Sequence, residues 1–94
     1  MKPKDIIAVV ADHYRLTPRD LTMRDRSSPK AEARQVAMYL TFSSRPDWND
    51  VSRAFRRDRG TVRHAIEVVS ARMDTEKKFR ARVTEIAVSL GVPV

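Results

Sequence analysis

The sequence predicts a single all-α domain of about six helices that contains a helix-turn-helix. Apolar residues recur at intervals of three and four along the whole chain, and capping or breaking residues stand where these segments begin and end. No segment shows the alternating pattern of a half-buried strand. At 94 residues the chain can bury one hydrophobic core, so we expect one domain over residues 1–94.

Two short helices are predicted first. Apolar spacing indicates a helix from residue 5 to about residue 14, with Asp5 near its N-terminus. Thr17 and Pro18 then supply an N-cap and a first-turn proline for a second helix that ends near residue 21 or 22.

The third helix follows a polar loop over residues 23–28. Ser28 is its expected cap, Pro29 takes its first position, and it runs to about Phe42. Its expected buried stripe is formed by Ala33, Val36, Ala37, Met38 and Leu40.

A tight connection joins the next two helices. Asp47 caps the fourth helix, Arg56 and Arg57 form the connection, and Asp58 caps a longer fifth helix. Two helices joined by about three residues form a helix-turn-helix, with the second helix lying across the first. The expected core residues of this pair are Trp48, Val51, Ala54, Phe55, Val62, Ala65, Ile66, Val69 and Met73.

The last helix is predicted to begin with Thr75 as its cap and to end at Gly91 and Pro93. Its apolar residues repeat at three and four, a pattern that suits either the core of this chain or a dimer seam. They are Phe79, Val83, Ile86, Ala87 and Leu90.

The charge of the chain favours an anionic polymer as its partner. The net charge is +7, and residues 24–63 hold +5 of it. Arginine outnumbers lysine fourteen to five, which suits bidentate contacts to phosphate and guanine, although a GC-rich genome produces the same bias.

Composition argues against catalysis, a metal centre or a bound nucleotide. The chain has no cysteine, and His13 and His64 are its two histidines, far from any obvious carboxylate cluster. The two glycines, Gly60 and Gly91, cannot form a glycine-rich phosphate loop. We therefore expect a non-enzymatic protein with no cofactor.

The apolar runs, of which residues 6–11 are among the longest, are far below the roughly 20 residues needed to cross a bilayer. We expect no signal peptide before the first helix, because Lys2, Lys4 and Asp5 lead straight into an amphipathic pattern. These features predict a cytoplasmic, nucleoid-associated protein without a membrane partner.

Five arginines crowd residues 53–65, where the fifth helix begins. A helix N-terminus already favours anions, and guanidinium groups one turn apart can reach both the backbone of a duplex and guanine edges in its major groove. A solvated charged face between two core helices is the alternative. In a helix-turn-helix the residues expected to enter the groove are Arg57, Asp58, Arg59, Gly60, Thr61 and Arg63.

Individual roles follow from side-chain chemistry. Arg59 can pair with guanine O6 and N7, and Thr61 can cap, touch a thymine methyl or bond a phosphate. Asp58 could accept from a cytosine amino group, although capping already gives it a full role. His64 is expected to be packed or backbone-bonded rather than to contact DNA. We assign Trp48 and Phe55 to the core rather than to a stacking platform for single strands.

Arg24 and Arg26 lie in the polar loop with no packing reason to be there. A basic loop beside a helix-turn-helix can reach into the neighbouring minor groove, and a solvated loop is the competing account. Arg56 belongs to the same basic surface. Lys30 and Arg34, on the third helix, are expected to contact phosphates without reading sequence.

The order of these features resembles the C-terminal DNA-binding domain of the bacterial replication initiator DnaA, from Ile6 to about Leu90. The most specific part of the match is the run Ala33, Arg34, Gln35, Val36, Ala37, Met38, Tyr39, Leu40. Other matching pieces are Val9, Tyr14, Asp20 and Leu21, the basic loop, and Arg57, Asp58, Thr61, Val62, His64 and Ala65.

The resemblance implies a Trp-repressor-like helix-turn-helix that reads a short asymmetric duplex site. It implies that Arg26 enters the minor groove, and that the segment matching the family motif Arg-Asp-His-Thr-Thr touches bases. Here Arg59 replaces the histidine and Gly60 replaces the first threonine. Arg56 stands where the family has turn glycines, with one residue missing, and Asp25 interrupts the basic loop. We expect backbone positioning on DNA to be kept and the usual site of the family not to carry over.

These observations predict a sequence-preferring double-stranded DNA-binding protein that regulates transcription or replication initiation in a bacterium. The alternative is an adaptor that has lost specific DNA recognition and docks on an acidic replication or transcription protein. RNA binding is a third alternative, which would need a preference for single strands or hairpins, and the expected lack of exposed aromatic residues argues against it. Met1 lies directly before the first helix, so we expect a complete small protein rather than an excised domain. The oligomeric state stays open.

Overall fold

The computed structural model describes residues 1–24 and 28–93, and within them the chain forms six α-helices and no β-strand. The helices are α1 (Pro3–His13), α2 (Pro18–Thr22), α3 (Ser28–Ser44), α4 (Trp48–Phe55), α5 (Arg59–Thr75) and α6 (Lys77–Leu90). The all-α prediction is confirmed. The first helix begins two residues earlier than expected, and the third runs two residues further.

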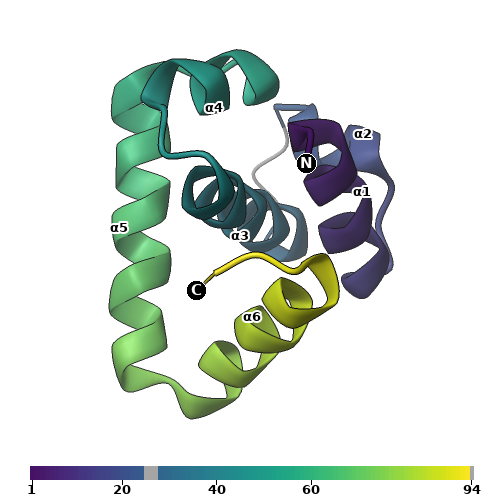
Figure 1. Ribbon diagram of the computed structural model, residues 1–94, viewed down its shortest axis with the longest axis vertical. Helices are drawn as coiled ribbons and strands as arrows, with labels where there is room; N and C mark the ends of the chain where they lie inside the picture. The colour runs from purple at the N-terminus through teal and green to yellow at the C-terminus, as the bar shows by residue number, and fades with distance from the viewer. Residues whose placement is uncertain (25–27, 94) are drawn as a thin grey trace.

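Helix α3 forms the centre of the fold. It packs against α1, α2, α4 and α5, while α6 packs against α1 and α5 (Figure 1). The middle of this helix is buried or partly buried on every side, as expected for an element enclosed by its neighbours. Its predicted stripe is fully buried, from Ala33 to Leu40. Long α5 lies along one side of α3, and α1 and α2 lie on the other.

One continuous core joins all six helices. Its large, fully enclosed side chains come from every element and include Ile6, Val10, Leu21, Val36, Met38, Leu40, Val51, Phe55, Val62, Val69, Val83 and Ile86. The last helix contributes Phe79, Val83, Ile86, Ala87 and Leu90 to this core, so its apolar face is covered within the chain. The core therefore holds the helix-turn-helix against α1 and α3.

Local caps define where the helices start. Thr17 and Asp20 form a reciprocal capping box at α2, with the Asp20 amide donating to Thr17 Oγ1 at 3.3 Å and the Thr17 amide donating to Asp20 Oδ2 at 2.9 Å. Asp47 Oδ1 accepts from the Asn49 amide at 2.9 Å and caps α4. These predicted caps are confirmed.

The predicted cap of the last helix is wrong. Helix α5 continues through Thr75, whose hydroxyl donates to the Ala71 carbonyl at 3.3 Å, and Glu76 takes the N-cap position of α6. Arg72 holds the Glu76 carboxylate through Nε and Nη2, at 3.0 and 3.1 Å. The connection therefore forms at Glu76, one residue later than a Thr75 cap would place it.

A second polar cluster joins α1, α3, α5 and α6 near the C-terminal end of α5, away from the turn between α4 and α5. Glu32 on α3 accepts from the Tyr14 hydroxyl at 2.7 Å and from Arg72 Nη1 at 2.9 Å, and Arg82 of α6 lies 3.5 Å from its other oxygen. Although burial opposes the charged form, the hydrogen bonds from Tyr14 and Arg72 hold the pKa of Glu32 below its ordinary value. The cluster fixes α1 and α6 relative to α3 and α5.

Candidate nucleic-acid interface

The turn between α4 and α5 consists of residues 56–58 and is held from within. Arg56 ends α4 in the left-handed conformation, with φ 52° and ψ 46°. The Arg57 amide donates to the Ser52 carbonyl at 3.1 Å, and the Ser52 hydroxyl donates to the Arg57 carbonyl. This turn sets the crossing of α5 over α4 without a glycine.

Asp58 caps α5, as predicted. Its Oδ1 accepts from the Thr61 amide at 2.7 Å, and hydrogen bonds from the hydroxyl and amide of Thr61 hold the pKa of the Asp58 carboxyl below its usual range. The carboxylate therefore satisfies a free amide of the first turn.

The first turn of α5 is exposed. Arg59, Gly60, Thr61 and Arg63 all face solvent, whereas Val62 between them is buried in the core. The polar side chains of this turn therefore project away from the protein on a helix that the core holds in place.

Arg57 connects the turn to the end of α2. Its Nη2 donates to the Met23 carbonyl at 2.8 Å, and its Nη1 donates to the Phe55 carbonyl at 2.9 Å, with longer bonds to Thr22 and Arg56. A guanidinium suits the C-terminal ends of α2 and α4, where carbonyl groups lack helical partners. Much of the donor capacity of Arg57 is used inside the protein.

Arg34 has a similar internal role. Only 8% of the residue is exposed, and its guanidinium donates to the carbonyls of Leu21 at 2.8 Å and Met23 at 2.7 Å. A third bond, at 3.2 Å, goes to Asp20. This side chain therefore satisfies the free carbonyls at the end of α2, and its expected phosphate contact stays a prediction. Arg34 and Arg57 share the Met23 carbonyl, so together they anchor the start of the basic loop.

Lys30 is half-buried and forms an ion pair with Asp20 at 3.4 Å. This pair fixes α3 to the capping box of α2. Lys30, like Arg34, therefore supports the position of the loop from α3.

The basic loop begins at the surface. Arg24 is exposed. The resemblance assigned Arg26 to the minor groove and gave Asp25 as the charge that interrupts the basic loop. Both residues lie outside the described part of the chain. Arg24 comes directly after Met23, the residue whose carbonyl accepts from both Arg34 and Arg57.

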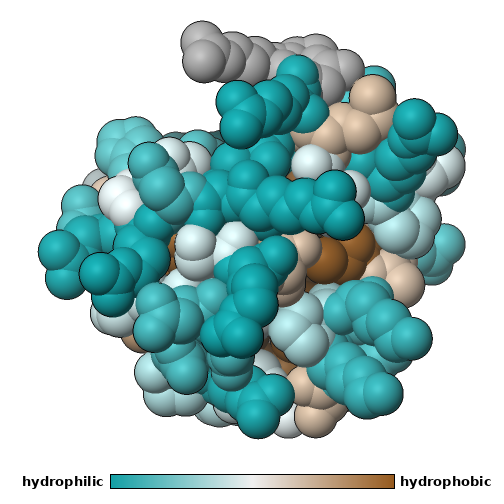
Figure 2. Space-filling view, turned by 90° about the horizontal axis from the view of Figure 1, so that it is seen from above, coloured by the Kyte–Doolittle hydropathy of each residue, from teal (hydrophilic) through white to brown (hydrophobic). Residues whose placement is uncertain are grey.

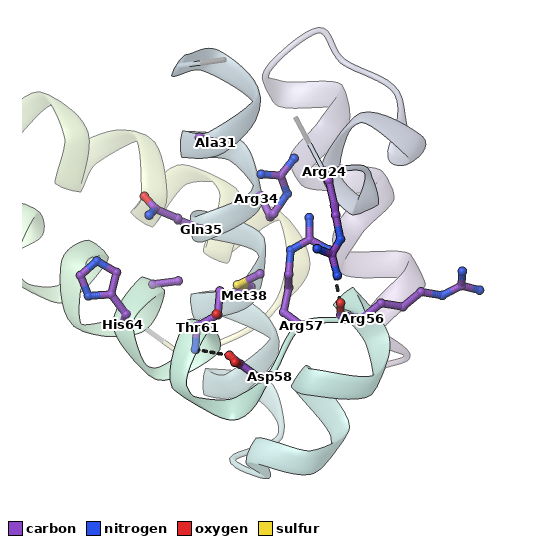
Figure 3. A pocket seen from close by; sticks show the side chains of 11 residues that line it. Arg24, Ala31, Arg34, Gln35, Met38, Arg56, Arg57, Asp58, Thr61 and His64 are labelled. Carbon is purple, nitrogen blue, oxygen red and sulfur yellow. Dashed lines mark hydrogen bonds between the residues drawn. The ribbon is translucent and has the colours of Figure 1, made fainter. Parts of the chain in front are cut away.

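A cavity of about 530 Å³ lies between Arg24 and the first turn of α5. It is lined by Arg24, by Ala31, Arg34, Gln35 and Met38 of α3, by the turn residues Arg56, Arg57 and Asp58, and by Thr61, His64 and Ala65 of α5 (Figure 3). Most of its charged side chains are arginines, and the one carboxylate is the capping group. Seen from the end of the molecule that carries α4, hydrophilic side chains cover most of the surface (Figure 2).

Sequence reasoning missed three residues of this surface. His64, expected to be packed, is exposed and lines the cavity, because its position falls on the rim of α5 that faces α3 rather than on the buried stripe. Gln35 lines the same cavity from α3. The available signal was the Arg34–Gln35 pair, because two polar residues interrupt the apolar run of α3.

The third missed residue is Trp48. Phe55 is fully buried, as predicted, whereas Trp48 is partly buried and lines a second cavity of about 330 Å³ with Arg59, Gly60 and Arg63. Its pairing with the exposed turn of α5 depends on the crossing of α4 and α5, which local sequence does not specify.

Among the described residues, no group of three or more His, Cys, Asp or Glu side chains could hold a metal ion. No helix in this part of the chain is long and apolar enough to cross a membrane.

The sequence of the chain matches a known family over most of its length. Residues 3–69 match the family model described as the bacterial dnaA protein helix-turn-helix. The chain belongs to this family. The match covers the helix-turn-helix, the cavity and α3, so the predicted resemblance is confirmed.

Several chromosomal replication initiator proteins DnaA are similar to this chain. The protein from Bacteroides thetaiotaomicron is 32% identical over 88 residues, which cover 87% of this chain and 18% of the relative. Those from Sphingopyxis alaskensis and Bifidobacterium animalis are both 35% identical, over 93% and 96% of this chain. The chain spans only about a fifth of the length of these curated relatives.

Proposed function

We propose that this protein binds double-stranded DNA with α5 in the major groove and the basic loop at the adjacent minor groove. The observation that carries the proposal is that the exposed first turn of α5 and Arg24 flank one basic cavity. When a helix lies in the major groove and a loop lies in the next minor groove, the sugar-phosphate backbone of one DNA strand runs between them. A concave, arginine-lined surface of this kind suits that strand.

In this proposal the exposed residues of α5 read bases. Arg59 pairs with a guanine edge, Thr61 contacts a thymine methyl or a phosphate, and Arg63 lies one turn further along the groove. Gly60 leaves the backbone of this turn open to close approach.

The remaining basic residues bind or support the backbone contacts. Arg24 and Arg56 are exposed and meet phosphates, and Arg26 extends the loop into the minor groove. Lys30, Arg34 and Arg57 hold the loop and the turn in place through the internal bonds described above.

The relatives are named as chromosomal replication initiators. On that basis we assign this protein a role in regulating replication initiation or transcription through the sites it binds, without catalysis or a nucleotide of its own.

Selection of bound duplexes from a random pool tests the proposal. We expect enrichment of one short asymmetric motif. Arg59→Ala should then cost about 1–3 kcal/mol on the selected duplex and relax the preference at one position. Arg80→Ala is the matched control, because it removes the same charge from an exposed site on α6. If Arg59→Ala bound selected and random duplexes as the wild type does, base reading by α5 would be wrong.

An adaptor for an acidic protein partner is the second candidate. It is favoured by the altered recognition turn, in which Arg59 and Gly60 replace the histidine and the first threonine of the family motif. No enrichment from the pool, together with no duplex binding at low salt, would support the adaptor.

A further inference from the structure

An aromatic pair lies against the exposed turn of α5. Phe42, near the end of α3, and Trp48, at the start of α4, stack with ring centroids 4.1 Å apart and an interplanar angle of 29°. Both rings are partly buried beside the core. Phe42 therefore fixes Trp48 from behind, and the position of the indole is well defined.

Arg63 lies over this indole. Its Cζ atom is 5.4 Å from the centroid of the Trp48 ring, which is within the range of a cation–π interaction. Arg63 is otherwise exposed, and its guanidinium is the one that approaches Trp48 from α5. A guanidinium that stacks on a ring keeps its N–H groups, which lie in its own plane, available as donors.

Arg59 joins the same surface. Arg59 and Arg63 are four residues apart and so lie on one face of α5, where they line the cavity of about 330 Å³ together with Trp48 and Gly60. Gly60 keeps this cavity open, since a Cβ there would meet only Asp58 Oδ1, at 3.8 Å. The cavity is bounded by two cations and one aromatic ring, and none of these four residues is acidic.

We infer that Trp48 is a positioning residue that holds Arg63 beside Arg59, so that both guanidinium groups meet paired acceptor atoms of DNA. The acceptors are either the O6 and N7 atoms of a guanine or two oxygens of one phosphate. A free arginine must lose rotamer freedom when it binds, and an arginine already stacked on a ring loses less. This inference rests on the proposed function. It assigns to Trp48 the role of orienting Arg63, the second arginine of α5 that faces the DNA.

A double-mutant cycle on duplex affinity separates positioning from packing. We expect Arg63→Ala to weaken binding to the selected duplex by at least about fivefold. Trp48→Leu should weaken it by about two- to fivefold, the range of an exposed cation–π interaction. The double variant should bind no more weakly than Arg63→Ala alone. If Trp48→Leu weakened binding by the same factor in both backgrounds, or had no effect, the inference would be overturned.

A duplex with modified bases distinguishes guanine acceptors from phosphate acceptors. On a duplex in which 7-deazaguanine replaces guanine, N7 is lost and O6 remains, so a guanine contact predicts that the difference in affinity between wild type and Arg63→Ala shrinks. A phosphate contact predicts that their difference persists, and that Arg63→Ala lowers the salt slope by about one unit. Either result supports the inference, and no difference between the two proteins on any duplex contradicts it.

Fluorescence provides a test that leaves the indole intact. Trp48 is the single tryptophan of the chain, so its emission reports on this site alone. We expect duplex DNA to change the emission, Arg63→Ala to abolish most of the change at saturating duplex, and Arg80→Ala to leave it unchanged. An identical change with and without Arg63 would refute the positioning role. If the wild type bound no duplex at all, the proposed function itself would fail; additive mutations in a protein that does bind would overturn only this inference.

Discussion

Replacing Arg56 by glycine should stabilise the protein and weaken its binding to DNA. Arg56 has φ 52° and ψ 46°, close to the ideal left-handed helical conformation, in which a Cβ approaches the following carbonyl oxygen. This conformation costs about 1–2 kcal/mol for a residue with a side chain. Glycine avoids the cost, but it loses about 0.5–1 kcal/mol more backbone entropy on folding. The difference predicts a net gain of about 0.5–1 kcal/mol.

For a domain of this size, 1 kcal/mol corresponds to a rise in Tm of about 4–8 °C. Thermal and urea denaturation followed by far-UV circular dichroism would measure it. Binding should change in the opposite direction, because the variant lacks an exposed guanidinium beside the proposed phosphate strand. We expect lower affinity on every duplex and a salt slope shallower by about 0.9.

Arg15 offers a matched control. It has φ 57° in the turn between α1 and α2, far from the helix-turn-helix, and it is also exposed. Arg15→Gly should therefore raise stability by a similar amount and leave the salt slope unchanged. If Arg56→Gly left stability unchanged or reduced it, the reasoning about the turn would be refuted; if it stabilised the protein but bound DNA like the wild type, the phosphate role of Arg56 would be wrong.

Four further variants probe the cap, the loop anchor and the polar cluster. Asp58→Ala should lower the Tm, because the Thr61 amide loses its acceptor, and Asp58→Asn should restore most of it. Gly60→Ala should raise stability by about 0.5–1 kcal/mol in urea denaturation, since the added Cβ has room; a loss would mean that this turn of α5 does not tolerate a Cβ. Arg34→Ala should cost about 2–4 kcal/mol, because three carbonyls lose their donor, and Arg34→Lys should fail to restore them; full stability of the alanine variant would contradict the anchor role. Glu32→Gln should cost about 1–2 kcal/mol at pH 7. Because the pKa of Glu32 is lowered on folding, its charge stabilises the protein above the unfolded pKa of about 4.3, so the difference between wild type and Glu32→Gln should shrink as pH falls below about 4. A difference that stayed constant down to pH 3 would exclude this origin.

The sequence predicted what is decided locally. Asp47 and Asp58 cap their helices because an N-cap bonds to amides two or three residues away, and apolar spacing marks which face of each helix is buried. The predicted Thr75 cap was wrong, because the Thr75 hydroxyl donates back to the Ala71 carbonyl within α5 and Glu76 takes the N-cap position of α6. A threonine can either cap the next helix or bond back to its own helix, and its position in the sequence does not decide which. The helix-turn-helix and the exposed turn of α5 could therefore be located before the structure, but this junction could not.

The partners of basic side chains were not predictable. The sequence does not distinguish Arg34 and Arg57 from Arg59. In the structure Arg34 and Arg57 both donate to the Met23 carbonyl, which lies 11 and 34 residues away from them along the chain. In the same way, Trp48 meets Arg63 only because α4 and α5 cross at this point. A local pattern shows that a surface is basic, and tertiary contacts decide which of its cations face outward.

Duplex affinity as a function of salt concentration tests the central claim most directly. DNA binding through the arginine-lined face predicts that log Kd rises linearly with log salt concentration, with a slope of about 0.9 for each phosphate contacted. Arg24→Ala and Arg56→Gly should each reduce that slope, and Arg80→Ala should not. No binding of any duplex at low salt, or an affinity that does not depend on salt, would contradict the account.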